Sequence, residues 1–306
     1  MSKARLTIAF LSLVVLLGCS GLNRAEHNKT AEALPHPLFV RVTGSGPPIV
    51  FLHGLASSNR YWDKLIERFE KTNTIVAPDL LGFGRSPWPD IDFTVADHLA
   101  ALTPTIEQVI GNKKAIVVGH SLGAILALDY AIAYPDRVDR LILLSPPHVN
   151  SREDLEERLS SSSMFESVMA MNSFVAPLAC WFHESVGAKS VFMFRPFIRD
   201  LPEAVIEDVA LHTWRSYNGS LEHLIIRQRL EALLEKTVRP VVIIVARFDR
   251  TADADGIAAI GRALNVPVRV VDGEHNFLVQ DEGAATGKVY EQIIDGQLPQ
   301  VPVRAK

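Results

Sequence analysis

The sequence predicts an α/β fold, in which a mostly parallel central sheet is flanked by helices. Short apolar runs alternate along the chain with stretches of helical periodicity, which is the pattern of successive βαβ units. The runs are apolar at nearly every position, as in strands that are buried on both faces. The length of 306 residues suits one such domain with an inserted subdomain.

The expected strands and helices follow in order from residue 39. The first run, Phe39–Val42, alternates in polarity and predicts a strand of the antiparallel type. The other strands are expected over Ile49–His53, Thr74–Ala77, Ala115–Gly119, Leu141–Leu144, Pro240–Val245 and Val268–Val271. Between them, apolar spacing predicts amphipathic helices over Tyr61–Phe69, Val95–Ile110, Ala124–Tyr134 and Gly256–Leu264.

One long segment breaks this alternation. Residues 147–236 contain no convincing strand but are rich in aromatic side chains, from Phe165 to Tyr217. A structureless loop of that length is implausible inside a compact domain. We therefore expect a helical cap over 147–236, inserted into a core formed by 38–146 and 237–306. Most of the aromatic residues would form the core of the cap, and a minority would line a pocket.

The overall composition argues against a nucleic-acid-binding protein. The chain has 31 Lys and Arg against 35 Asp and Glu, a net charge of −4, and no concentrated basic segment. Binding to phosphates requires such a segment. At 48% hydrophobic residues, the chain has enough apolar side chains to bury a full core.

The N-terminal residues have the features of an export signal. Lys3 and Arg5 precede the apolar run Leu6–Leu17, which has the length of a signal-peptide hydrophobic region. A membrane-spanning helix would need about 20 apolar residues. The run is therefore interpreted as a signal, either of the lipoprotein type or of the ordinary secretory type, or as an uncleaved anchor.

The end of this run resembles a bacterial lipobox, Leu16-Leu17-Gly18-Cys19. That resemblance implies a signal peptide over 1–18, lipid attachment to Cys19 and a polar membrane tether over 19–37. Ser20 after the cysteine implies sorting to the outer membrane in a Gram-negative bacterium.

The chain has only two cysteines, Cys19 and Cys180. With Cys19 lipidated, no intramolecular disulfide is expected. Cys180 lies in an apolar stretch and is interpreted as a buried small hydrophobic residue rather than a nucleophile.

The strongest chemical signal is Gly119-His120-Ser121-Leu122-Gly123. It matches the nucleophile elbow G-x-S-x-G and stands between an apolar run and a helical pattern, as that motif requires. A sharp turn from strand to helix would expose the Ser121 hydroxyl, and the N-terminus of the helix would favour negative charge that develops nearby.

Two further motifs precede the elbow. Ile49–Leu55 resembles the strand and oxyanion-hole turn of the α/β-hydrolase fold family, and Asp79–Ser86 resembles its D-x-x-G-x-G-x-S loop. The resemblance covers nearly the whole chain after the tether and is weakest in the cap. It implies a catalytic triad in the order serine, acid, histidine.

The family resemblance places the remaining site residues. Ser121 would be the nucleophile, Asp249 after the strand at 240–245 would be the acid, and His275 after the last strand would be the base. The backbone N–H groups of Leu55 and Leu122 would form the oxyanion hole. Other acidic residues fit less well. Two resemble helix-start residues and two precede the histidine too closely, namely Asp253, Asp255, Asp272 and Glu274.

Several other residues are interpreted as structural. His53 and His120 are expected to shape their turns, and Asp79 is expected to organise its loop by binding backbone N–H groups. The other histidines lack metal-ligand spacing, and Gly82-Phe83-Gly84 lacks the rest of a dinucleotide loop. No metal and no cofactor are therefore expected.

The resemblance and the motifs together predict a serine hydrolase that cleaves carboxylic esters with apolar acyl or aryl groups. Two alternatives stay open. His53-Gly54 followed by Tyr61-Trp62 resembles hydrolases that cleave C–C bonds in meta-cleavage products. A binding protein that has kept the fold without catalysis is the other. Ser121 argues against dehalogenases and epoxide hydrolases, which use an aspartate nucleophile.

Overall fold

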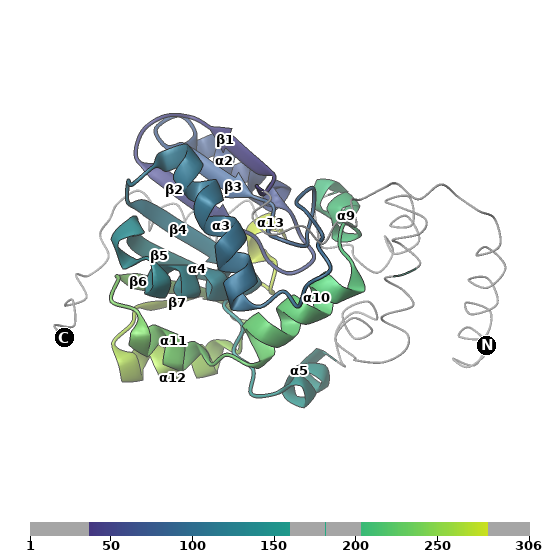
Figure 1. The fold of residues 1–306 in the computed structure, drawn as a ribbon. Helices are drawn as coiled ribbons and strands as arrows, with labels where there is room; N and C mark the ends of the chain where they lie inside the picture. The colour runs from purple at the N-terminus through teal and green to yellow at the C-terminus, as the bar shows by residue number, and fades with distance from the viewer. Residues whose placement is uncertain (1–36, 160–180, 182–202, 281–306) are drawn as a thin grey trace, which may run out of the picture.

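A seven-stranded sheet forms the middle layer of the protein, with strand order β1-β3-β2-β4-β5-β6-β7. The structure is a computed structural model that describes residues 37–159, 181 and 203–280 (Figure 1). Only β1 runs antiparallel to its neighbour, β3, and the other pairs are parallel. The strands are β1 (Val40–Thr43), β2 (Pro48–Leu52), β3 (Thr74–Pro78), β4 (Ala115–His120), β5 (Val138–Leu144), β6 (Val241–Ala246) and β7 (Val268–Val271).

Each strand falls within a residue or a few of its predicted position, and the predicted fold class is confirmed. β2 and β6 are buried at every residue, which is why their sequences are apolar without alternation. β1 is an edge strand with half-exposed residues, and its alternating sequence reflects that position.

Helices cover both faces of the sheet (Figure 1). Along β2, Val50 and Leu52 belong to one buried cluster, whereas Ile49 and Phe51 belong to the other. The first cluster includes side chains of α3 (Val95–Ile110), α4 (Leu122–Ala133), α11 (Leu230–Lys236) and α12 (Ala254–Leu264). The second includes side chains of η1 (Asn59–Trp62), α2 (Asp63–Phe69) and α13 (Phe277–Gln280).

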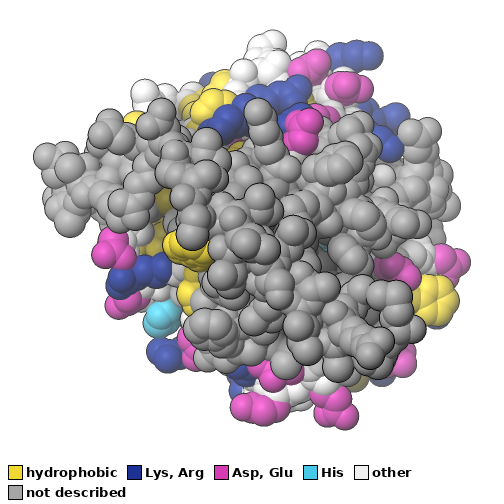
Figure 2. All heavy atoms as spheres, turned by 90° about the vertical axis from the view of Figure 1, so that its right-hand side faces the viewer, with side chains coloured by type: hydrophobic (Ala, Val, Ile, Leu, Met, Phe, Trp, Pro, Cys, Tyr) yellow, Lys and Arg dark blue, Asp and Glu magenta, His cyan; other side chains and the backbone are white. Residues whose placement is uncertain are grey.

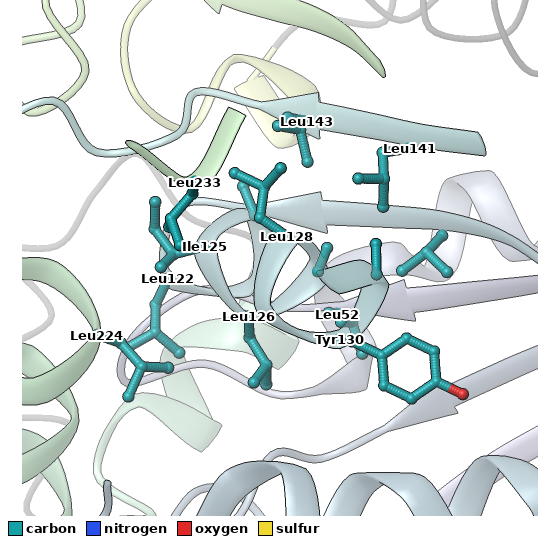
Figure 3. Packing of buried hydrophobic residues seen from close by; sticks show 14 of the residues in the cluster. Leu52, Leu122, Ile125, Leu126, Leu128, Tyr130, Leu141, Leu143, Leu224 and Leu233 are labelled. Carbon is teal, nitrogen blue, oxygen red and sulfur yellow. The ribbon is translucent and has the colours of Figure 1, made fainter. Parts of the chain in front are cut away.

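The described residues between β5 and β6 form helices, but they do not test the boundaries of the predicted cap. These helices are α5 (Arg152–Leu159), α9 (Glu203–Val209), α10 (Trp214–Ser220), η5 (Leu221–Ile226) and α11. Helix η5 has π-type geometry and packs over the start of α4, where Leu224 lies beside Leu122 (Figure 3). Most of the aromatic residues of the predicted cap lie outside the described residues.

The N-terminal predictions also lie outside the described residues. This applies to the signal over 1–18, to Cys19, to most of the tether over 19–37, and to Cys180. None of the helices in the described ranges combines the length and the apolar character that crossing a membrane requires.

Between β2 and β4, the order in which the chain adds strands to the sheet reverses. From β2 the chain passes to β3 on one side, and it then crosses to β4 on the other side of β2. In open parallel sheets, ligands bind outside the carboxyl ends of the strands at such a point. The residues that follow β2 and β4 are His53-Gly54-Leu55 and Ser121-Leu122, which are therefore candidates for a site.

Candidate active site

Ser121 occupies a sharp turn between β4 and α4. Its backbone has φ 53° and ψ −122°, a conformation that residues with a side chain rarely adopt. The backbone N–H donates to the carbonyl of Leu144 at 2.9 Å, so Ser121 remains attached to the neighbouring strand β5. The flanking Gly119 is required by space, because a Cβ there would lie 2.2 Å from the carbonyl oxygen of Gly123.

The Ser121 hydroxyl is the first member of a chain of three hydrogen-bonded side chains. Its Oγ lies 3.0 Å from Nε2 of His275, and Nδ1 of His275 lies 2.8 Å from Oδ2 of Asp249. Since the carboxylate only accepts, Nδ1 carries the proton of a neutral His275, and Nε2 is the acceptor that faces the serine hydroxyl. The structure thus brings together the three residues proposed from sequence as nucleophile, base and acid.

Asp249 is 5% exposed and is held in one orientation. Its second oxygen, Oδ1, accepts the backbone N–H groups of Thr251 and Ala252, each at 2.9 Å. Burial opposes ionisation, but His275, together with the backbone N–H of Ala252, outweighs burial and lowers the pKa of the Asp249 carboxyl. The carboxylate is therefore ionised at neutral pH.

The two predicted oxyanion-hole residues lie in turns that adjoin Ser121. Leu122 is the first residue of α4, and its side chain points toward Leu224 of η5 while its backbone lies at the N-terminus of the helix (Figure 3). Leu55 follows Gly54, and a Cβ built on Gly54 would lie 3.2 Å from the Cβ of Ser121. The glycine thus allows the turn after β2 to approach the nucleophile closely.

His53 stabilises that turn through hydrogen bonds to main-chain groups. It is fully buried, its Nδ1–H donates to the carbonyl of Gly54 at 2.8 Å, and its Nε2 accepts the backbone N–H of Leu80 at 2.8 Å. Burial lowers the pKa of His53, which keeps the ring neutral with this pattern of donor and acceptor. Both ring nitrogens serve backbone groups, in line with the local structural role expected from sequence.

Asp79 organises the loop after β3. Its Oδ1 accepts the backbone N–H of Asn59 at 2.7 Å, and its Oδ2 accepts the backbone N–H of Arg85 at 2.9 Å. Gly84 has φ +57°, and a Cβ there would lie 2.5 Å from Oδ2. The D-x-x-G-x-G-x-S motif therefore encodes a loop wrapped around one buried carboxylate.

Two supporting features were not identified from sequence. Thr251 and Ala252 orient the acid Asp249 through their backbone N–H groups. An aspartate that accepts N–H groups two and three residues later is a recognisable Asx-type signal.

The second feature is Asp208 of α9, which accepts from Ser58 at 2.6 Å and pairs with Arg60 at 3.2 Å. These contacts attach α9 to the loop after β2. No local pattern could have predicted that pairing, because 150 residues separate Ser58 and Asp208.

The described residues contain no group of three or more His, Cys, Asp or Glu side chains that could hold a metal ion. The chemistry that the described groups offer is proton transfer between a serine hydroxyl and an imidazole that is backed by a carboxylate.

Curated relatives include hydrolases of different kinds. The 2-(acetamidomethylene)succinate hydrolase of Mesorhizobium japonicum is 25% identical over 268 residues, which cover 84% of this chain and 91% of that protein. Lipase LipV of Mycobacterium tuberculosis is 39% identical over 103 residues, 33% of this chain and 38% of the lipase. An uncharacterised protein of the same bacterium is 35% identical over 131 residues. The matched residues are 43% of this chain and 38% of that protein, so this chain spans much less than two thirds of the length of that relative.

Solved structures show the same fold at low sequence identity. The crystal structure of E-2-(acetamidomethylene)succinate hydrolase has a TM-score of 0.64 at 23% identity, and the match covers 84% of this chain and 95% of that chain. A thermophilic esterase from Thermogutta terrifontis has a TM-score of 0.59 at 22% identity, with coverage of 85% and 92%.

The family model described as "alpha/beta hydrolase fold" matches residues 47–282, which include strands β2 to β7, the elbow and all three hydrogen-bonded side chains. Together with the sheet order and the position of the elbow, this match shows that the chain belongs to the α/β-hydrolase fold family.

Proposed function

We propose that the protein is a serine hydrolase that cleaves carboxylic esters with apolar acyl or aryl groups through an acyl-enzyme on Ser121. The observation that carries the proposal is the continuous chain from Ser121 Oγ through His275 to the buried carboxylate of Asp249, with spacings of 3.0 and 2.8 Å. These are hydrogen-bond distances between a nucleophile, a base and an orienting acid.

Each group has one task in the proposed reaction. Nε2 of His275 takes the hydroxyl proton as Ser121 Oγ attacks the carbonyl carbon, and the backbone N–H groups of Leu55 and Leu122 stabilise the oxyanion. His275 then gives its proton to the leaving alkoxide, and the ester C–O bond breaks. A water molecule, activated by the same base, releases the acid from Ser121. Asp249 remains ionised throughout and stabilises the imidazolium.

The choice of esters is supported by similarity to a lipase and to an esterase fold. The motif that favoured C–C bond hydrolysis receives no support from its position. Trp62 is fully buried, and its ring centroid lies 5.0 Å from that of Phe51. Tyr61 is 5% exposed, and its ring stacks on the ring of His120. These two side chains belong to the core beneath the site rather than to a surface that a substrate could reach.

The proposal is tested with nitrophenyl esters of graded acyl length, using the purified protein beside its Ser121→Ala variant. We expect turnover by the wild type, loss of at least about a thousandfold in the variant, and a preferred chain length that reports the depth of the pocket. Failure of the wild type on every ester, with hydrolysis of vinylogous diketones, would favour the C–C alternative. Failure on both, with no fluorophosphonate labelling of Ser121, would favour a binding protein.

We also propose that the protein is an exported lipoprotein, anchored through Cys19 in the outer membrane of a Gram-negative cell. The support is the lipobox-like sequence after a short apolar run. Metabolic labelling with an alkyne fatty acid should mark the wild type and not the Cys19→Ala variant. Labelling of both proteins, or of neither, would contradict the anchor.

A further inference from the structure

The residue before the nucleophile, His120, has an environment that the proposed mechanism does not use. Its side chain is almost fully buried at 2% exposure and lies between two rings. Tyr61 stacks on it with ring centroids 4.6 Å apart at 18°, and the ring of His275 lies 4.9 Å away at 47°. His120 thus contacts the general base of the proposed reaction directly.

The geometry determines which nitrogen of His120 carries its proton. Burial, followed by the neighbouring His275, lowers the pKa of His120 to about 3, so the ring is neutral and has a single N–H. Nε2 lies 3.0 Å from the backbone carbonyl oxygen of His275, which can only accept. The N–H must therefore be on Nε2.

The other nitrogen faces the turn after β2. Nδ1 is a bare acceptor with no hydrogen-bond partner in the described part of the chain, and a Cβ built on Gly54 would lie 3.1 Å from it. One neutral ring therefore packs against the oxyanion turn, adjoins the nucleophile in sequence and donates to the loop that carries the base.

The loop that carries His275 needs such a tether because it starts at a strand that lies far from Ser121 in the sheet. His275 follows β7, an edge strand, whereas Ser121 follows β4, and β6 and β5 lie between them in the sheet. With strands about 4.8 Å apart, the loop must reach back roughly 14 Å across the carboxyl ends of two strands. The bond from the Phe248 N–H to the carbonyl of Gly273 holds the loop near its start, and the bond from His120 holds it at the base itself.

We infer that His120 is a positioning residue, which sets the distance between the base and the nucleophile by donating Nε2–H to the His275 carbonyl. This inference rests on the proposed function for its kinetic consequence but not for the hydrogen bond. A displacement of a reacting group by about 1 Å can cost on the order of 100-fold in rate, so one tether at the base has a measurable effect.

Two variants of matched length separate this role from simple packing. His120→Gln keeps an N–H donor near the position of Nε2, and His120→Met has similar length without the donor. Methionine fits the apolar surroundings better, so a packing role ranks Met above Gln in activity. A positioning role ranks Gln above Met.

Full-chain protein is assayed on the nitrophenyl ester that the wild type prefers, with thermal unfolding measured in parallel. We expect kcat of His120→Met to fall by about 10- to 100-fold with KM within about threefold, and His120→Gln to recover most of the loss. Wild-type kcat in His120→Met, or Gln no better than Met, would overturn the inference.

A measurement on the wild type keeps the inference testable if the Met variant does not fold or if no ester is hydrolysed. In protein with 15N-labelled histidine, NMR should show His120 protonated on Nε2 between pH 5 and 8. A proton on Nδ1 would overturn the inference. Inactivity of the wild type on every ester, with Nε2 protonated, would overturn the proposed function and leave the tether intact.

Discussion

At the scale of single residues, the conformation of Ser121 shows how the fold presents its nucleophile. A φ of 53° with ψ −122° places a residue that has a Cβ in a region that glycine prefers, at a cost of about 1–3 kcal/mol. The turn is maintained from both sides, by the hydrogen bond to Leu144 and by the first turn of α4. The strain directs Oγ away from the strand and toward His275.

This strain predicts an ordering of two inactive variants. Both Ser121→Ala and Ser121→Gly lose the hydroxyl, but only glycine relieves the backbone. We expect the Gly variant to be more stable than the Ala variant by about 1 kcal/mol, since relief of strain exceeds the extra entropy of glycine in the unfolded chain. Urea unfolding of the two proteins measures the difference. An Ala variant equal to or more stable than the Gly variant would show that the turn is not strained.

Asp249 offers a second residue-scale prediction. In Asp249→Asn, the amide oxygen can still accept from Thr251 and Ala252, so the fold should be retained. The amide N–H₂ would then face Nδ1 of His275 and favour the wrong tautomer, with the proton on Nε2. We expect kcat on the preferred ester to fall by about 10⁴-fold, with circular dichroism unchanged. A loss below about tenfold would mean that another group orients His275.

At the scale of elements, the site depends on close contact between the start of α4 and the end of β2. A Cβ on Gly123 would lie 2.2 Å from the carbonyl oxygen of Leu52 and 2.5 Å from that of His53. Only a glycine allows the helix that follows the nucleophile to approach the strand that precedes the oxyanion turn. The two halves of the proposed oxyanion hole are held together by this contact.

Gly123→Ala should therefore separate the two elements. We expect a loss of stability of about 3 kcal/mol or more, because the clash is with backbone that cannot rotate away, together with a fall in kcat. Gly111→Ala is the matched control. Gly111 has φ +59° and ψ −132°, close to the conformation of Ser121, but open space around its Cβ position, so that variant should lose only about 1–2 kcal/mol from backbone strain and keep its activity. Equal losses in the two variants, measured by urea unfolding, would argue against the contact.

At the scale of the whole molecule, the sheet separates two buried clusters, and most charged side chains of the described residues are at least partly exposed, although Asp79, Asp129, Asp208 and Asp249 are buried. On the face shown in Figure 2, the described Lys and Arg side chains lie beside Asp and Glu side chains rather than in a patch of one sign. A charged group that does lie inside is Asp129 of α4, which is 8% exposed and accepts from Gln228 at 2.8 Å. Burial raises the pKa of Asp129 to about 6.

That raised pKa predicts how global stability depends on pH. The folded protein binds the Asp129 proton more tightly than the unfolded chain does, so this group lowers stability as pH rises from about 4 through 6. Above pH 6 the full cost is present, at most about 3 kcal/mol for a carboxyl whose pKa is raised from its ordinary value to about 6. Asp129→Asn should therefore be more stable than the wild type at pH 8 and equal to it at pH 4. Urea unfolding at both pH values tests this, and a difference that does not change with pH would point to another titrating group.

The resemblance to the α/β-hydrolase fold family pointed to Asp249 and His275, whereas the strands, the main helices and the turn at Ser121 followed from the sequence by itself. These features are local: uniform apolar runs mark buried strands, glycines mark tight turns, and motifs keep fixed spacing. The expected helix at 256–264 even had its start marked by Asp253, which caps α12 by accepting from the N–H of Gly256. The carboxyl ends of parallel strands lie at one edge of the sheet, so residues that follow different strands could be expected to meet.

Only the tertiary structure decided which distant groups touch. The donation from His120 to the His275 carbonyl spans 155 positions in the chain, and the bond from Ser58 to Asp208 spans 150. Strand order, not sequence spacing, sets the first pair, because it determines which loops lie over which strand ends, and the second pair depends on where α9 packs. The protonation state of His120 was likewise hidden in the sequence, since it depends on burial, and burial is a property of the packed fold.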